Sequence, residues 1–237
     1  VTTGDLNDTL RNIENITGSA GNDLINGDAA ANILSGHDGD DYFNASAGGD
    51  TYNGGIGIDT LNYYNRADAA AITINLDGNN VTTVNVTGGA NDTVRNIENV
   101  TGTTGNDSFT GNGSTNEFYG MEGNDIFIGG GGDDILLSAG GDDFITGGAG
   151  NDRIDGGSGS DTIEGGSGAD SFVFRNINEP DRDMILDFDP VQDTLIIVGI
   201  SSHGQLGRFK DILIVVTVKG REIIYGDYLL NLIGKDA

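Results

Sequence analysis

The chain has 237 residues, of which 41 are glycine and none is cysteine or tryptophan. Its 37 acidic side chains outnumber 11 lysines and arginines, and residues 1–172 hold 27 of the acidic side chains but only 4 of the basic ones. Such a field repels nucleic acids and anionic membrane surfaces, so neither is expected as a partner. Without cysteine there is no disulfide and no thiolate metal site, and no apolar run approaches the roughly 20 residues of a membrane span.

An eleven-residue segment near the start, Asp8 to Gly18, returns 84 residues later as Asp92 to Gly102. The chain begins inside this pattern without a signal peptide, as a fragment would. We therefore expect a modular array, sampled from partway into one module.

Two blocks of phased nonapeptides follow the pattern Gly-Gly-x-Gly-x-Asp-x-U-x, in which U is a large apolar residue. Block one runs from Thr17 to Leu61 in five repeats, whose six-residue loops span residues 18–23, 27–32, 36–41, 45–50 and 54–59. Block two runs from Thr101 to Phe172 in eight repeats, whose loops end at Asp107, Asn116, Asp125, Asp134, Asp143, Asp152, Asp161 and Asp170. Each repeat bends the chain once, so two repeats make one coil and each loop stacks on the second loop after it.

This periodicity predicts an all-β fold, a right-handed parallel β-roll, with the apolar residue of every repeat stacked inward between two small sheets. The expected core residues are Ile25, Leu34, Phe43, Tyr52, Leu61, Phe109, Phe118, Phe127, Leu136, Ile145, Ile154, Ile163 and Phe172. So thin a core buries little, and rows of Asp repel one another at roughly 5 Å strand spacing. Without cations we expect the roll to be largely unfolded.

Residues 62–100 alternate as short strands, with Ile72, Ile74 and Leu76 on one face and a turn after Leu76. This pattern favours a packed spacer over a binding site. The series Val94, Ile97 and Val100 lacks strand alternation, and we interpret it as a turn that caps the next roll.

After Val173 the glycine loops stop and apolar strands are expected at 184–188, 194–198, 212–218, 222–225 and 228–233. A repeat stack needs a terminal unit at its open end, and this stretch fits that role. The predicted segments are therefore residues 1–61 (partial repeat module), 62–100 (β spacer), 101–172 (second block) and 173–237 (C-terminal cap and possible export signal).

The loops have the chemistry of a hard-cation site. Glycines at the first, second and fourth loop positions allow positive φ and turn carbonyl oxygens inward, while the sixth position adds a carboxylate. Calcium suits such oxygen ligands better than magnesium, zinc or copper, and we expect His37 and His203 to be solvated rather than ligands. The expected metal-site carboxylates are Asp23, Asp41, Asp50, Asp59, Asp107, Asp125, Asp134, Asp143, Asp152, Asp161 and Asp170. The glycines expected beside them are Gly21, Gly39, Gly57, Gly105, Gly123, Gly132, Gly141, Gly150, Gly159 and Gly168.

Stacked repeats allow at most nine sites between loops, three in block one and six in block two. Asn32 and Asn116 lack charge, Ala45 replaces a glycine, and Ser138-Ala139 replaces two. Because calcium affinity follows ligand charge, we expect about six to eight filled sites. The paired acids Asp40-Asp41, Asp133-Asp134 and Asp142-Asp143 are interpreted as calcium ligands rather than as a catalytic pair.

The nonapeptides resemble the RTX family of bacterial exoproteins, which carry calcium β-rolls near the C-terminus. The boundary from Gly165 to Phe174, followed by Asp183-Met-Ile-Leu-Asp-Phe and Asp193-Thr-Leu, is similar to the end of the roll in serralysin-like proteases. The resemblance implies passage of an unfolded chain through the type I secretion machinery, folding in extracellular calcium, and an export signal near the C-terminus.

The sequence has no His-Glu-x-x-His, no Gly-x-Ser-x-Gly and no cysteine nucleophile, so we expect no enzyme activity in this chain. Two functions stay open. The chain is either a calcium-triggered folding and export module with its active partner upstream, or part of a large adhesin or glycan-binding protein. The 84-residue repeat favours the second, for which Tyr63-Tyr64, Phe118-Tyr119 and Tyr228 are possible sugar platforms, although core packing is expected for most of them.

Overall fold

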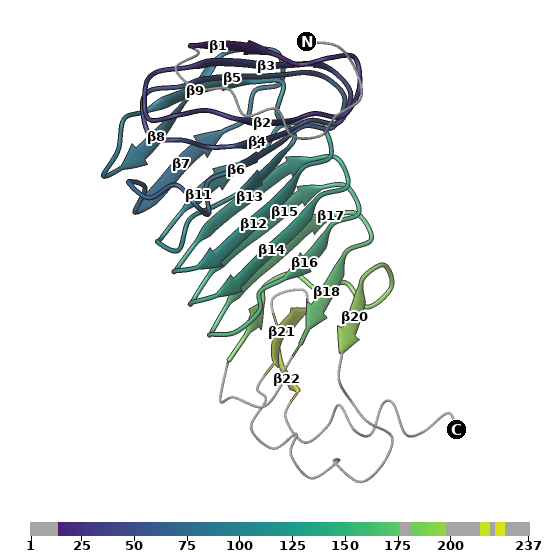
Figure 1. Ribbon diagram of the computed structural model, residues 1–237. Helices are drawn as coiled ribbons and strands as arrows, with labels where there is room; N and C mark the ends of the chain where they lie inside the picture. Colours follow the sequence, from purple (N-terminus) through teal and green to yellow (C-terminus); the bar gives the residue numbers. More distant parts are fainter. Residues whose placement is uncertain (1–13, 176–181, 198–213, 219–220, 226–237) are drawn as a thin grey trace, which may run out of the picture.

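The structure is a computed structural model that describes residues 14–175, 182–197, 214–218 and 221–225. Two sheets of 13 and 9 strands face each other, and successive nonapeptide strands alternate between them. Within each nonapeptide block, neighbours in a sheet are parallel and 18 residues apart, as in the pairing of Leu34 with Tyr52. The chain is therefore a solenoid that gains one coil with every two repeats (Figure 1), which confirms the predicted β-roll.

The nine-stranded sheet contains, in spatial order, β2 (Leu24–Asn26), β4 (Tyr42–Asn44), β6 (Thr60–Asn62), β10 (Asn99–Thr101), β12 (Glu117–Glu122), β14 (Ile135–Gly140), β16 (Arg153–Asp155), β18 (Ser171–Phe174) and β20 (Thr194–Ile197). The 13-stranded sheet contains β1 (Asn15–Thr17), β3 (Ile33–Asp38), β5 (Thr51–Ile56), β9 (Asp92–Arg95), β8 (Thr82–Thr87), β7 (Ala71–Asn75), β11 (Ser108–Thr110), β13 (Ile126–Gly131), β15 (Phe144–Ala149), β17 (Thr162–Ser167), β19 (Met184–Ile185), β21 (Ile214–Val218) and β22 (Arg221–Tyr225). Among the described residues there is no helix long and apolar enough to cross a membrane.

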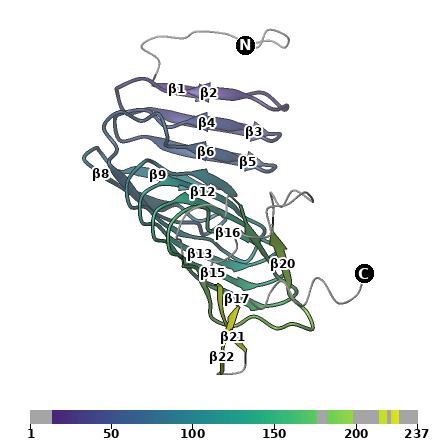
Figure 2. The same ribbon diagram turned by 90° about the horizontal axis from the view of Figure 1, so that it is seen from below.

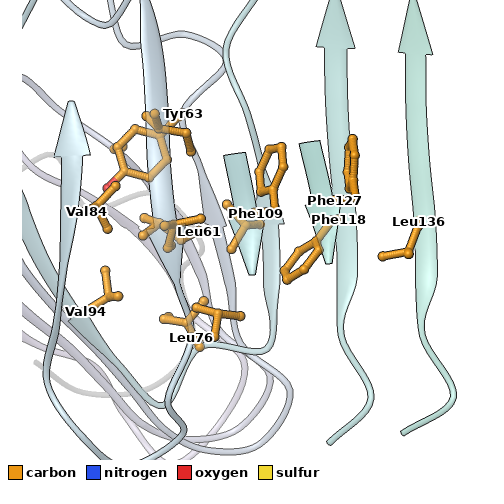
Figure 3. Close-up of a cluster of buried hydrophobic side chains, with 14 of the residues drawn as sticks. Leu61, Tyr63, Leu76, Val84, Val94, Phe109, Phe118, Phe127 and Leu136 are labelled. Atoms are coloured by element: carbon orange, nitrogen blue, oxygen red, sulfur yellow. The ribbon is translucent and has the colours of Figure 1, made fainter. Parts of the chain in front are cut away.

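Within the nonapeptide blocks, the core between the two sheets is a row of apolar side chains, one from each repeat strand. Figure 3 shows part of this row, including Phe118, Phe127 and Leu136. All thirteen expected core residues are buried, and the most exposed of them, Ile25, is only 5% exposed. The ring of Phe109 stacks on those of Phe118 and Phe127 at centroid distances of 5.3 and 4.8 Å. Each repeat thus contributes one apolar residue, so a single coil has no core of its own.

The two blocks form one continuous stack. In the nine-stranded sheet, Leu61 pairs with Val100, which pairs with Phe118. In the other sheet, β5 pairs with β9, and the antiparallel strands β8 and β7 fill the gap to β11. Figures 1 and 2 show that the strands change direction at this joint.

The spacer is therefore built into the roll. The predicted alternation is confirmed, because Ile72, Ile74 and Leu76 are buried. The interpretation of 94–100 as a turn capping the next roll was wrong, since Val94 lies in β9 and Val100 in β10, and both strands pair with block one. Their apolar spacing is irregular because the segment crosses from one sheet to the other.

Both sheets extend beyond the last nonapeptide. β19 pairs with β17 and β20 with β18, while β21 and β22 form an antiparallel hairpin next to β19. The strand expected at 184–188 ends at Ile185, because Asp187 turns back and accepts hydrogen bonds from the backbone N–H groups of Gly165 and Gly166. The strand expected at 228–233 lies outside the described residues.

Removal of this terminal unit should weaken folding of the whole roll. A chain truncated after Phe174 loses the partners of β17 and β18 but keeps all the loop carboxylates. We expect its calcium-induced folding, followed by far-ultraviolet circular dichroism, to require at least about tenfold more calcium or to disappear, since each coil needs a template. An unchanged calcium midpoint and cooperativity would show that the terminal unit is a passenger.

Candidate metal centres

The sixth-position carboxylates form ladders along the two edges of the roll. In each ladder, one carboxylate oxygen accepts the backbone N–H of the equivalent residue one coil earlier. Asp143 Oδ1, for example, accepts from Asp125 N at 2.7 Å, and Asp161 Oδ1 accepts from Asp143 N at 2.9 Å. This contact fixes the orientation of the carboxylate and leaves its second oxygen for another partner.

That second oxygen is unpaired in seven of the loops. Each of the seven Oδ2 atoms is buried and accepts no hydrogen bond from any described residue; they belong to Asp41, Asp59, Asp125, Asp134, Asp143, Asp152 and Asp161. A buried carboxylate oxygen without a partner is costly, because nothing replaces the water that it loses. The structure therefore has seven positions where a bound cation would relieve that cost.

A backbone carbonyl shares the same space. An added Cβ on Gly147 would lie 2.6 Å from Gly165 O, one coil later, and would also meet Asp152 Oδ2. Gly129 faces Gly147 O and Asp134 Oδ2 in the same way. Glycine at the first loop position leaves room for these two oxygens, although Ala45 and Ser138 occupy it in two loops. The predicted positive φ at this position was wrong, since positive φ occurs at the second and fourth positions.

The fourth-position glycines bring successive loops into contact. Eight of the ten expected at metal sites have positive φ: Gly39, Gly57, Gly123, Gly132, Gly141, Gly150, Gly159 and Gly168. A Cβ on Gly132 would lie 2.5 Å from the carbonyl carbon of Ser114, one coil earlier. Gly21 and Gly105, the remaining two, do not have positive φ. They belong to loops 18–23 and 102–107, in which the sixth-position aspartate accepts a hydrogen bond from the N–H of the second loop residue.

The backbone at loop position two separates the loops into two kinds. It has positive φ in all seven loops with an unpaired Oδ2, and in loop 165–170. Five of these eight loops have glycine there, whereas His37, Met121 and Ala139 adopt the conformation at φ 91°, 82° and 79°. These three strained residues show that the loop conformation is imposed by the stack rather than by glycine alone.

The other five loops satisfy the sixth residue internally. Asp107 Oδ2 accepts the N–H of Thr103 at 2.7 Å, and Asn116 Oδ1 accepts that of Asn112 at 3.0 Å. Loops 18–23 and 27–32 repeat this contact at 2.6 and 2.8 Å. In loop 45–50, Asp50 Oδ2 accepts from Ser46 Oγ and Tyr52 Oη at 2.8 and 3.0 Å. Asp23, Asp50 and Asp107 thus differ from the seven unpaired carboxylates, because protein donors already hold their Oδ2 atoms. In Asp50 and Asp107 the Oδ1 atom is held as well, by the N–H groups of Asn32 and Ile72.

Burial raises the pKa of the unpaired carboxyls. The pKa values of Asp125 and Asp161 rise to about 8, and those of Asp59 and Asp134 to about 7. Neighbouring carboxylates raise them further, while the ladder hydrogen bond lowers them. In the absence of a cation, a proton is therefore the alternative way to remove the buried charge.

An arginine takes the cation's place at the joint between the blocks. The side chain of Arg66 is fully buried, and its guanidinium pairs with Asp92 Oδ2 and, at 2.9 Å, with Asp68 Oδ1. It also donates to Gly48 O and Ala90 O at 2.9 and 2.7 Å. Arg66 thus combines carboxylate and carbonyl partners from successive coils, as a cation between stacked loops would.

The ladders include four carboxylates that the repeat pattern did not identify. Asp50 N donates to Asp92, Asp59 N to Glu98, Asp161 N to Asp183 and Asp170 N to Asp193. The signal was present as an acid followed two residues later by a buried apolar residue, as in Glu98-Asn-Val100. Without the loop glycines, this spacing alone does not distinguish a continuation of the stack.

The paired acids separate into two environments. Asp134 and Asp143 are buried in the ladder, whereas Asp133 and Asp142 are exposed. The exposed members accept the N–H of Asn151 and Ser160, one coil later. His37 is exposed, its Nδ1 3.1 Å from Asp38 Oδ1, and His203 lies outside the described residues.

The donor set fits calcium, which accepts carboxylate and carbonyl oxygens in flexible geometry. Among the described residues no three His, Cys, Asp or Glu side chains cluster as a metal site. Interfaces with an unpaired oxygen instead present one inward carboxylate beside a backbone carbonyl, such as Asp152 Oδ2 beside Gly165 O. The fold and the loops together define a calcium-type β-roll.

The chain matches the sequence profile of the RTX calcium-binding nonapeptide repeat in four copies, at residues 12–42, 27–61, 101–136 and 137–172. These cover more than half of its length, and the chain belongs to this family. No curated protein matches it. Among solved structures it is similar to the extracellular lipase LipA from Serratia marcescens, with 19% identity and a TM-score of 0.32 over 90% of this chain and 38% of the lipase.

The two kinds of loop should respond differently to substitution. Asp143→Ala removes an unpaired carboxylate from the longest run of repeats, whereas Asn116→Ala removes a neutral side chain that is already paired. We expect the first to raise the calcium midpoint of folding by about tenfold or more and to lower the fitted stoichiometry. The second should leave both nearly unchanged. Equal effects in a calcium titration would contradict the assignment.

Protons should partly replace calcium. Because the folded-state pKa values of Asp59, Asp125, Asp134 and Asp161 are raised, the folded roll binds more protons than the unfolded chain between the ordinary pKa and about 8. Its stability without calcium is therefore greatest at the acidic end of this range and is lost as the pH rises to about 8. Circular dichroism after removal of calcium should show more strand at pH 5 than at pH 8; the opposite order would refute the burial of these carboxyls.

Proposed function

We propose that this chain is a calcium-dependent folding module that binds one ion at each of the seven unpaired carboxylates. The observation that supports it is the set of buried, unpaired Oδ2 atoms, each on a carboxylate whose Oδ1 accepts the ladder hydrogen bond. We place these ions at Asp41, Asp59, Asp125, Asp134, Asp143, Asp152 and Asp161, within the expected range of about six to eight. Asp23, Asp50 and Asp107 then serve as structural residues.

Calcium supplies the folding energy in this proposal. The seven carboxylates are buried in ladders along the edges of the roll, so the empty roll combines charge repulsion with unpaired oxygens. Ions that bind the folded but not the unfolded chain convert their binding energy into stability. The module itself is non-catalytic, and any catalytic domain lies upstream.

The same dependence suits a protein that must cross a membrane unfolded. We propose that the parent protein is bacterial and is exported by the type I secretion machinery. It would stay unfolded in low cytosolic calcium and fold outside the cell or at its surface. Family membership supports this route. The residues expected to carry an export signal, 230–237, lie outside the described residues.

A second candidate function is a segment of a large adhesin that binds glycan or extracellular matrix. It is favoured by the 84-residue repeat and by the way spacer strands join one block to the next without a break. Of the expected sugar platforms, Tyr63 and Phe118 are buried, while Tyr64 and Tyr119 are exposed. Binding of the calcium-loaded chain to a glycan array would support this function, and a blank array would favour the folding module.

Calcium should fold the chain at extracellular concentrations. In chelator, far-ultraviolet circular dichroism should show mostly disordered chain, and strand signal should appear as free calcium rises through about 10⁻⁴–10⁻³ M. Magnesium should have much less effect, because it requires a rigid octahedron and keeps its waters. A chain that is fully folded in chelator at pH 8 would disprove the proposal.

A further inference from the structure

At the joint between the blocks, repeat loop 54–59 stacks on a turn that does not follow the nonapeptide pattern. The turn at Asn96–Glu98 lies between β9 and β10, where the next loop of the same edge would otherwise be stacked. Glu98 Oε2 accepts the backbone N–H of Asp59 at 2.9 Å, so Glu98 takes the ladder position of the missing aspartate.

A backbone carbonyl of the turn also replaces its counterpart in the repeat. The space beside Gly54 is bounded by Asn96 O and Asp59 Oδ2, as the space beside Gly36 is bounded by Gly54 O and Asp41 Oδ2. Asn96 has a positive φ of 51° and is held by its N–H bond to Gly78 O at 2.8 Å and its Nδ2 bond to Asn53 Oδ1 at 2.8 Å. The turn thus reproduces the carbonyl of a glycine loop with a non-glycine residue.

The carboxylate that faces this turn needs a partner. Asp59 is 0% exposed, and its Oδ2 accepts no hydrogen bond within the described part of the chain. The opposite edge of the joint has its own cation, because Arg66 pairs there with Asp92. No described lysine, arginine or histidine pairs with Asp59 or Glu98.

We propose that the joint contains a hybrid calcium site, formed by loop 54–59 and the turn 96–98. Asp59 Oδ2 and the carbonyl of Asn96 are its ligands, and the charge of Glu98 adds to the field that holds the ion. The site lies outside the pairs of stacked repeats that the nonapeptide pattern counts. It connects block one to the spacer, so calcium at this edge and Arg66 at the other hold the two blocks in one stack.

The inference rests on the proposed calcium binding and is tested on the whole chain by counting ions. Asp59→Asn keeps an oxygen for the N–H of Asp41 but replaces the unpaired Oδ2 with an amide donor. Asp50→Asn is the matched control, because Asp50 Oδ2 is already held by Ser46 and Tyr52. Bound calcium is measured by equilibrium dialysis at saturation, with circular dichroism to verify folding.

We expect seven ions in the native chain and in Asp50→Asn, and six in Asp59→Asn. An Asp59→Asn chain that folds and binds as many ions as the native chain overturns the hybrid site but leaves the proposed function intact. A native chain that binds no calcium overturns both. If Asp59→Asn does not fold, Glu98→Gln decides, since it keeps an acceptor for Asp59 N and loses only the charge. One ion should then bind at least about tenfold more weakly, and unchanged affinity for every ion rejects the site.

Discussion

The structure depends on how it neutralises buried carboxylates at the spacing of stacked strands. Every added coil places another acidic side chain next to the previous one, and the backbone hydrogen bond from coil to coil holds it there. One oxygen of each carboxylate is satisfied by this ladder. The stability of the roll is therefore determined by what the second oxygen binds.

The chain solves this problem in more than one way. A hydrogen bond from the second loop position satisfies Asp107, a serine and a tyrosine satisfy Asp50, and Arg66 satisfies Asp92. In the described part of the chain, the second oxygen of seven ladder carboxylates has no such partner. Loops without an unpaired oxygen form the first coil, at 18–32, and the first coil after the joint, at 102–116. Asp41 and Asp59 in block one, and the loops of block two from 120 to 161, depend on cations or protons. Calcium thus controls part of the stack more strongly than the rest.

The repeat pattern was sufficient to predict the two sheets, the row of core side chains and the positions of the loop carboxylates, because a strand, an apolar residue and a carboxylate or amide recur every nine residues. It could not predict the joint, since β7, β8 and β9 replace glycine loops with antiparallel pairing. Nor could it separate Asp107 from Asp125. That difference lies in whether position two donates to the carboxylate or adopts positive φ, and Met121 and Ala139 show that residue type alone does not decide it.

The most direct measurement is a crystal structure of the calcium-loaded chain, with the ions located by anomalous scattering. We expect density between the loops next to Asp41, Asp59, Asp125, Asp134, Asp143, Asp152 and Asp161, and none next to Asp23, Asp50 or Asp107, whose Oδ2 atoms are already paired. Ions distributed equally over both groups of carboxylates, or absent from the unpaired ones, would contradict the claim that the second carboxylate oxygen selects the calcium sites.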